Sequence, residues 1–334
     1  MTGAALAVPV LVAGVLVSLS TSWLLVSRLE RLGERFGLSE ALLGMVAALA
    51  ADTPEITSAI TALVHHEQGV GTGVAIGSNV FNLAGLLGLG AVVAGGIALH
   101  RRVVVLGGAV GVWVAVACLV PVLGLASPAA GLAITLAVLV PYVAILAVEG
   151  RGLGRLPLPK PWVTWLVAAV AEEELELSEA IRPRRGGPRD AGIAAVALLV
   201  VVGASAAMER AASVLGRHFA VPQIVVGGLA LAVITSLPNA VAAVYLAARG
   251  RGAAMLSTAL NSNALNVALG LLLPAAVIGL NPPSDAAKLV AAWYLGLTVF
   301  ALAFAYRDRG LRRSAGALII AAYLGFVVCL FTIA

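Results

Sequence analysis

Charged side chains are scarce in this chain of 334 residues: only 11% are Asp, Glu, Lys or Arg, whereas 61% are hydrophobic. The mean hydropathy is +1.05. This apolar share is far above that of a soluble globular domain. The composition therefore excludes an ordinary soluble protein and predicts an integral membrane protein whose first partner is the lipid bilayer.

Aromatic residues and cysteines are few as well. Five Trp, five Tyr and seven Phe leave little for stacking on bases, and the net charge of +5 comes from short basic clusters between apolar runs, so we expect no nucleic-acid partner. Cys118 and Cys329 both lie within apolar runs, where a thiol behaves as a small hydrophobic group. We therefore expect neither a disulfide nor a cysteine-bound metal.

Ten apolar runs are long enough to cross a bilayer core, which takes about 20 residues of helix. No basic stretch precedes residues 4–19, so the first run is expected to be a spanning helix rather than a cleaved signal. The runs lack the alternation of a membrane β-strand, which predicts an all-α fold. The predicted helices cover residues 4–27, 38–64, 70–97, 103–125, 128–148, 190–208, 220–247, 253–279, 286–306 and 314–333.

The basic residues predict how these helices are oriented. With both termini outside the cell membrane, all but three of the 21 Lys and Arg residues fall in inner loops, as cytoplasmic loops require. The exceptions are Arg210, Arg217 and Lys288. This distribution favours both the ten-helix count and extracytoplasmic termini.

A polar segment at 149–189 is predicted to be a cytoplasmic linker between a first five-helix repeat, 1–148, and a second, 190–334. Its apolar stretch Pro161–Ala171 is too short to span, so we expect a short interfacial helix carrying Trp162 and Trp165. Its acidic residues, Glu172, Glu173, Glu174, Glu176 and Glu179, are typical of a solvated helix face, with a regulatory role as the alternative.

Two stretches of the chain are copies of each other. Residues 50–82 contain Pro54, Ser78, Asn79 and Asn82, and residues 234–266 repeat all four at a constant offset of 184 without a gap. Five helices per half is an odd number, so the halves are expected to be inverted, and each stretch occupies helices 2 and 3 of its own half. Inverted repeats place their binding site near the midplane, on broken helices, here helices 2 and 7.

Asp52 and Glu55 are acidic residues inside a predicted spanning helix, where each charge costs about 2.5–3.5 kcal/mol. A spacing of three puts them on one helix face, and Pro54 between them disfavours helix at Thr53. Asp52 and Glu55 also fit a helix N-cap and its third residue, but capping alone does not require two carboxylates at membrane depth.

Around these carboxylates the two copies supply only oxygen donors, without Cys or His. Such donors suit Na⁺, Ca²⁺ or Mg²⁺ rather than Zn²⁺ or Cu⁺, although Ser and Asn also hydrogen-bond between membrane helices. The predicted cation ligands are Asp52, Glu55, Ser78, Asn82, Thr235, Ser236, Asn239, Ser262 and Asn266.

The Pro-Glu pair on one helix, the Gly-Ser-Asn-Val-Phe-Asn run on the next and an inverted copy of both resemble the alpha repeats of the cation/calcium exchanger superfamily, which includes sodium/calcium and proton/calcium exchangers. The resemblance implies alternating access with ions bound among helices 2, 3, 7 and 8, and no organic cofactor. The positions that match family ligands are Glu55, Ser78, Asn82, Thr235, Ser236 and Ser262.

This chain departs from the family pattern in its second copy. Asn239 replaces the second central glutamate, Asn261 replaces a glycine, and Asn266 stands where sodium/calcium exchangers often have Asp. The first copy has Asp52 in place of a Ser. The formal charge of the site is then about −2, which one divalent ion, two Na⁺ or two protons would neutralise.

The sequence is compatible with three functions: an antiporter of Ca²⁺ against Na⁺ or H⁺, an antiporter of Mg²⁺ or a monovalent cation against protons, and a cation channel. An enzyme is not expected, because the predicted intramembrane residues include no nucleophile with a base and no metal triad. His65-His66-Glu67 is not a zinc-protease motif and is expected to form a polar hairpin loop. The sequence leaves the oligomeric state undetermined.

Overall fold

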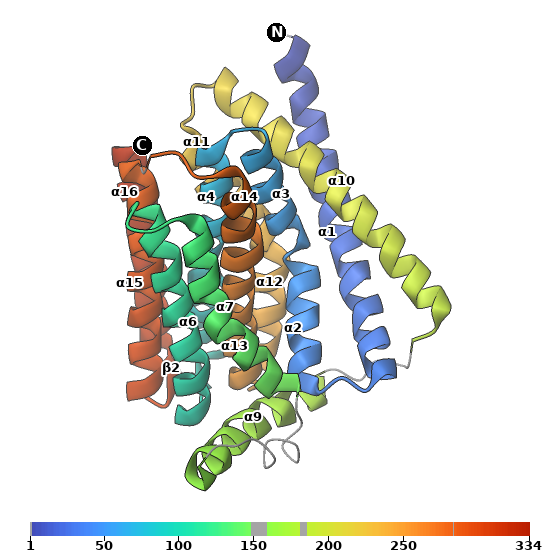
Figure 1. The fold of residues 1–334 in the computed structure, drawn as a ribbon, viewed down its shortest axis with the longest axis vertical. Helices are drawn as coiled ribbons and strands as arrows, with labels where there is room; N and C mark the ends of the chain where they lie inside the picture. Colours follow the sequence, from blue (N-terminus) through green and yellow to red (C-terminus); the bar gives the residue numbers. More distant parts are fainter. Residues whose placement is uncertain (1, 148–158, 181–185, 283) are drawn as a thin grey trace.

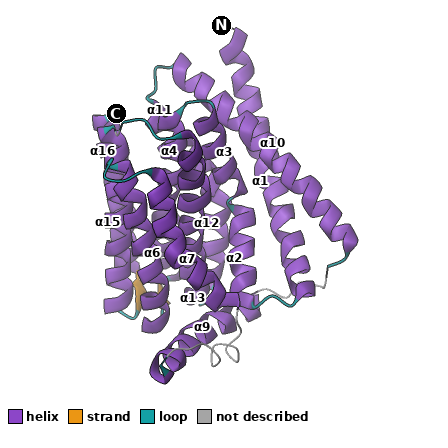
Figure 2. Ribbon diagram, viewed as in Figure 1, coloured by secondary structure: helices purple, strands orange, loops and turns teal. Residues whose placement is uncertain are grey.

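A computed structural model describes residues 2–147, 159–180, 186–282 and 284–334. Within them the fold is helical apart from one short strand pair (Figures 1 and 2). Among the described residues, nine helical segments are long and apolar enough to cross a membrane, and two 12-residue helices, α2 and α3, together supply a tenth crossing. The all-α, ten-crossing expectation is confirmed.

The first half contains α1 (Thr2–Phe36), α2 (Glu40–Ala51), α3 (Thr53–Val64), α4 (Gln68–Asn82), η1 (Leu83–Gly88), α5 (Leu89–Ala94), β1 (Gly96–Ala98), α6 (Arg101–Val122) and α7 (Pro128–Ala147). Helix α9 (Lys160–Ala180) follows. The second half contains α10 (Pro188–His218), α11 (Gln223–Val225), η2 (Val226–Leu231), α12 (Ala232–Ala248), α13 (Gly252–Leu265), η3 (Asn266–Leu272), α14 (Leu273–Ile278), α15 (Asp285–Arg307), β2 (Gly310–Arg312) and α16 (Arg313–Ile333).

Helices α1 and α10 are longer than the expected 4–27 and 190–208, and they pack against each other beside the remaining helices (Figure 1). The expected helix ends at Met208, before the charged residues Glu209 and Arg210. The helix nevertheless continues to His218, since Glu209 is buried and Arg210 reaches the turn between α3 and α4. Both chain termini lie at one end of the molecule.

Loops that the ten-helix topology places at the same end do contact each other. At one end, the α3–α4 turn meets α10 through Glu67 and Arg217, and Gln68 bonds to Gly279 before α15. At the other end, β1 pairs antiparallel with β2, with Ile97 opposite Leu311. Arg28 and Asp190 form an ion pair at this second end as well. The contacts therefore agree with the predicted succession of crossings.

Close backbone contacts hold the two halves together. A Cβ at Gly77 of α4 would lie 2.5 Å from the Cα of Gly228 in η2, and one at Gly227 would lie 2.1 Å from the carbonyl oxygen of Val70. Only glycine allows such an approach. The glycine-rich stretch before residue 78 therefore serves helix packing.

Helix α9 lies across the end of the molecule that carries β1 and β2, and contacts α2, α6 and α13. It extends well beyond the short helix expected at Pro161–Ala171. The side chains of Glu172, Glu173, Glu174, Glu176 and Glu179 lie outside the described residues, so their solvated or regulatory character stays untested.

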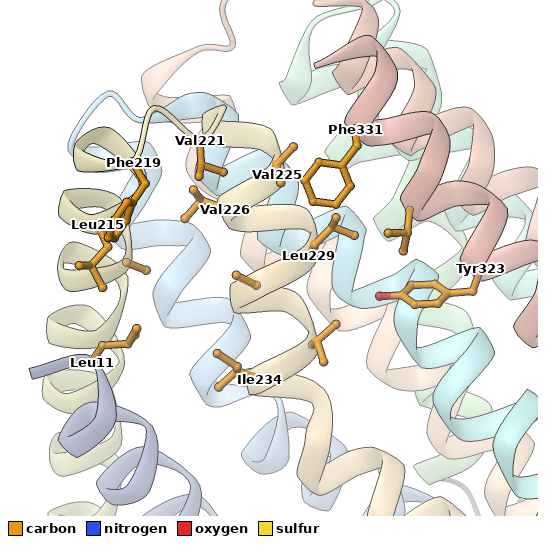
Figure 3. A pocket seen from close by; sticks show the side chains of 15 residues that line it. Leu11, Leu215, Phe219, Val221, Val225, Val226, Leu229, Ile234, Tyr323 and Phe331 are labelled. Atoms are coloured by element: carbon orange, nitrogen blue, oxygen red, sulfur yellow. The ribbon is translucent and has the colours of Figure 1, made fainter. Parts of the chain in front are cut away.

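An apolar groove of about 700 Å³ opens beside α10, between η2, α12 and α16. Figure 3 shows that its side chains are hydrocarbon except for the hydroxyl of Tyr323. Apart from that hydroxyl, the side chains of this groove offer no ligand atom to an ion, and the buried polar residues of the protein lie elsewhere.

Candidate cation site

The helix that carries Asp52 is interrupted at that residue. Asp52 ends α2 with φ −82° and ψ −3°, and α3 begins at Thr53 with Pro54 in its first turn. Pro54 contributes to the interruption because it has no amide hydrogen to continue the hydrogen-bond ladder of α2. The predicted break in helix 2 is confirmed.

The second copy is built differently. Pro238 lies inside the continuous helix α12, and the irregularity of this crossing is the wider π-helical turn η2, which ends seven residues before Pro238. Two further π-helical segments, η1 and η3, follow directly after Asn82 and at Asn266, at corresponding positions of the two repeats. These π-helical segments were not predicted, although such wide turns are often found at functional sites.

Asp52 does not act as a side-chain cap for α3. Its Oδ1 instead accepts hydrogen bonds from Asn239 Nδ2 at 2.6 Å and from Ser262 Oγ at 2.7 Å, both in the second repeat. Glu55 Oε1 accepts a bond from Ser236 Oγ at 3.0 Å. Both carboxylates are fully buried, so they are held by donors from the opposite repeat rather than by local capping.

These bonds obey the twofold relation between the repeats. Since the offset is 184, Asp52 corresponds to Ser236 and Glu55 to Asn239, so the bond between Asp52 and Asn239 is the counterpart of the bond between Glu55 and Ser236. Inverted helices crossing at a pseudo-twofold axis produce this pairing.

The asparagines show the same relation at the crossing of α4 and α13. Asn79 Nδ2 donates to the carbonyl of Asn263 at 3.0 Å, and Asn263 Nδ2 donates back to the carbonyl of Asn79 at 3.2 Å. Asn82 donates to Asn263 Oδ1, and its counterpart Asn266 donates to Asn79 Oδ1. Asn79 and Asn263 were not among the predicted ligands, although they correspond to each other at the constant offset of 184. Their reciprocal hydrogen bonds join the two repeats.

One part of the network is asymmetric. Ser262 donates to Asp52 and accepts from Asn82, whereas its counterpart Ser78 has no hydrogen-bond partner among the described residues. The difference follows from the charge, because Asp52 is a strong acceptor and its counterpart Ser236 carries only a hydroxyl. Residues of the second repeat thus donate two hydrogen bonds to Asp52, and the Ser78 hydroxyl is left without a partner among the described residues.

Five buried oxygen atoms of predicted ligands have no hydrogen-bond partner in the described part of the chain: Asp52 Oδ2, Glu55 Oε2, Ser78 Oγ, Asn82 Oδ1 and Asn266 Oδ1. Unpaired buried acceptors are costly, and an oxygen-coordinated cation would satisfy them. The described residues contain no cluster of three or more His, Cys, Asp or Glu. The oxygen donors that are present suit Na⁺, Ca²⁺ or Mg²⁺ rather than Zn²⁺ or Cu⁺.

The remaining predicted ligand, Thr235, is also buried, but its hydroxyl donates to the Leu231 carbonyl of its own helix. All nine predicted residues are therefore buried, and seven of them are connected across the repeats by hydrogen bonds: Asp52, Glu55, Asn82, Ser236, Asn239, Ser262 and Asn266.

Glu209 in α10 is a further buried carboxylate that the sequence reasoning assigned to a loop. Its Oε1 accepts a hydrogen bond from Ser213 at 2.9 Å, and its electrostatic neighbours are Glu67, His65 and Arg210. It belongs to the contact between α10 and the α3–α4 turn, not to the cross-repeat network.

Fold and site together define a multi-pass membrane protein of the inverted-repeat transporter class, with a carboxylate and amide centre at the repeat interface. The family described as "Sodium/calcium exchanger protein" matches residues 6–149 and 190–332. The chain belongs to this family.

Individual relatives agree with the family assignment. The inner membrane protein YrbG of Escherichia coli (strain K12) is 25% identical over 281 residues, which are 81% of this chain and 80% of YrbG. The solved structure of the sodium-calcium exchanger NCX_Mj matches with a TM-score of 0.63 at 19% identity, covering 97% of this chain and 98% of that one. Native YfkE matches with a TM-score of 0.63 at 16% identity, covering 98% and 99%. These structures show the shared fold.

Proposed function

We propose that the protein is a secondary active antiporter of the cell membrane that exchanges Ca²⁺ for Na⁺ or H⁺ by alternating access. The observation that carries the proposal is the pair of buried carboxylates, Asp52 and Glu55, surrounded by oxygen atoms without partners where the inverted repeats meet. Oxygen donors of this kind suit Ca²⁺ and Na⁺.

In this proposal all nine predicted residues surround the transported ions. Glu55 Oε2, Ser78 Oγ and Asn266 Oδ1 are free to ligate, and Asp52 Oδ2 and Asn82 Oδ1 add to them. The bonds from Ser236 and Asn239 hold the carboxylates in place when the cation is absent. Backbone carbonyls near the interrupted helix provide further oxygens.

The charge of the site suggests the exchange ratio. Asp52 and Glu55 supply two negative charges, and Asn239 supplies none, so one Ca²⁺ or two monovalent ions give the same neutral centre. Exchange of one Ca²⁺ for two Na⁺ or two H⁺ then avoids burying uncompensated charge in the membrane. Residues 149–189 serve as a cytoplasmic linker in this proposal, and both termini face out.

Asn239 also favours a second candidate. The family pattern has glutamate at this position, and the change from carboxylate to amide alters the oxygens offered to an ion. Mg²⁺ or a monovalent cation exchanged against protons therefore belongs in the same test.

The test is a flux screen in proteoliposomes. Uptake of Ca²⁺, Mg²⁺ and monovalent cations is measured with an outward Na⁺ gradient or an outward proton gradient in turn. The proposal expects saturable Ca²⁺ uptake that depends on one of the two gradients. Uptake that needs no counter-ion would indicate a channel, and gradient-driven uptake of Mg²⁺ or a monovalent ion without Ca²⁺ would favour the second candidate.

A further inference from the structure

Helix α9 has two tryptophans that are not buried. They lie at the end of the molecule that carries β1 and β2, which is the inner end in the proposed topology. Leu166, Ala169 and Val170 form its buried face against the transmembrane helices, whereas Trp162 is 65% exposed and Trp165 is partly exposed. Tryptophan in this setting is typical of the membrane interface, where its ring lies at the level of the lipid headgroups.

These tryptophans line a groove of about 400 Å³ between the first two turns of α9 and those of α6. The other lining residues are Pro161 and Val105, so the walls are almost entirely apolar. The groove continues into an exposed stripe on α6, because Ala109, Trp113 and Val116 follow Val105 at helical spacing and all are exposed. Groove and stripe form one apolar track from the interface toward the membrane centre.

Two basic side chains, Arg102 and Lys160, lie where this track begins, beside the groove. Arg102 precedes Val105 by about one helical turn, and Lys160 is the neighbour of Pro161; both are exposed. Neither side chain forms an ion pair or hydrogen bond within the described part of the chain. Arg101 is engaged differently, since its guanidinium lies over the Tyr306 ring and bonds to the Tyr306 carbonyl.

We infer that the α6–α9 groove is a binding site for one anionic phospholipid of the inner leaflet. The phosphate of the headgroup binds between Arg102 and Lys160, the glycerol region contacts Trp162 and Trp165, and an acyl chain follows the stripe on α6. The charge of the two unpaired cations selects an anionic headgroup over a zwitterionic one, and the apolar track selects a lipid over a free phosphate. This inference is independent of which ion the protein transports.

The lipid would tie α9 to the membrane helices. Helix α9 packs on α6, α2 and α13, and the last two carry residues next to or within the cation centre. A headgroup that bridges Lys160 and Arg102 adds a contact between the linker helix and the first turn of α6. The bound lipid would therefore help to hold α9 against the membrane helices that it contacts.

The test uses tryptophan fluorescence of the full chain in nanodiscs of phosphatidylcholine. A small fraction of the lipid is replaced by phosphatidylglycerol or phosphatidylcholine with brominated acyl chains, which quench tryptophan on contact. Trp23→Phe, Trp113→Phe and Trp293→Phe leave only Trp162 and Trp165 to report; the protein with all five tryptophans serves if this variant does not fold.

We expect brominated phosphatidylglycerol to quench several-fold more than brominated phosphatidylcholine. Arg102→Gln with Lys160→Gln should abolish that preference, whereas Arg249→Gln with Arg313→Gln, which removes two charges elsewhere at the same end, should keep it. Equal quenching by both lipids in the unmodified groove, or a preference that survives the first double variant, would overturn the inference. Absence of quenching by either lipid would do so too, because the groove would then be covered by protein.

Discussion

Asp52 differs from its counterpart Ser236 by a carboxylate, and this single difference explains the asymmetry of the polar centre. Asp52 attracts Asn239 and Ser262, while Ser78 has no partner among the described residues. Asp52 thus accepts two hydrogen bonds from the second repeat, whereas Glu55 accepts only the one from Ser236. This makes Glu55 the residue on which cation binding should depend most.

Glu55→Gln is expected to abolish gradient-driven uptake, because it removes half of the formal charge of the site. The fold should persist, since the glutamine amide oxygen can still accept the bond from Ser236. Radiolabelled Ca²⁺ uptake and the melting temperature provide the two readouts. Glu209→Gln is the matched control, a buried carboxylate outside the network that should keep most of the uptake. Wild-type rates in Glu55→Gln would remove Glu55 from the site.

Asn239→Glu would place a second carboxylate where the Asn239 amide now lies 2.6 Å from Asp52. We expect a loss of stability of about 1–3 kcal/mol without cations, because a good donor is replaced by a like charge. Ca²⁺ should then raise the melting temperature more than it does in the wild type. Asn239→Gln, which keeps the amide at the length of glutamate, should not show this larger shift; an equal Ca²⁺ response in all three proteins would contradict the expectation.

At the scale of elements, Pro54 made the interruption between α2 and α3 predictable, but Pro238 at the corresponding position lies inside the continuous helix α12, so proline alone does not decide where such a helix is interrupted. The π-helical segments η1, η2 and η3 were not predictable, since no residue type demands a wide turn and tertiary packing decides it. The full length of α10 was also missed, because Glu209 and Arg210 look like a loop until their partners in the α3–α4 turn are known.

The contact between α4 and η2 should tolerate no side chain at Gly77. Gly77→Ala is expected to cost about 1–3 kcal/mol, because its Cβ would lie 2.5 Å from the Cα of Gly228 and backbone must move. Gly296→Ala in α15 has no neighbour within 4 Å and should be neutral or slightly stabilising. Thermal unfolding in detergent compares the two variants. Equal melting temperatures would argue against the tight contact.

At the scale of the whole molecule, the constant offset between the repeats also indicates which residues pair with each other across the repeats, beyond the ligands predicted from it. A constant offset of 184 in an inverted pair makes a bond between the copies imply a second one wherever the corresponding residues are the same, as the Asn79–Asn263 pair illustrates. Which bonds form could not be read from the sequence, because the crossing of α4 and α13 depends on packing far from these residues. The set of buried polar positions was predictable, whereas its hydrogen-bond pattern was not.

The proposed orientation predicts the labelling of two exposed positions at opposite ends, Pro282 and Arg249. In a background with Cys118→Ala and Cys329→Ala, Pro282→Cys should react with an impermeant maleimide on intact cells. Arg249→Cys should react only after the membrane is opened, because the basic loops are expected to face the cytoplasm. The reverse pattern would invert the proposed topology while leaving the fold unchanged.

The central claim is that Asp52 and Glu55 alone supply the charge that transported cations neutralise. The most direct measurement is Ca²⁺ uptake into proteoliposomes under a fixed Na⁺ or proton gradient, with the membrane potential set by a potassium gradient and valinomycin. The account predicts gradient-driven uptake whose rate stays the same at positive, zero and negative potential, because one Ca²⁺ exchanges for two monovalent ions. Uptake that rises steeply with potential would contradict it, since a further charge would then cross in each cycle.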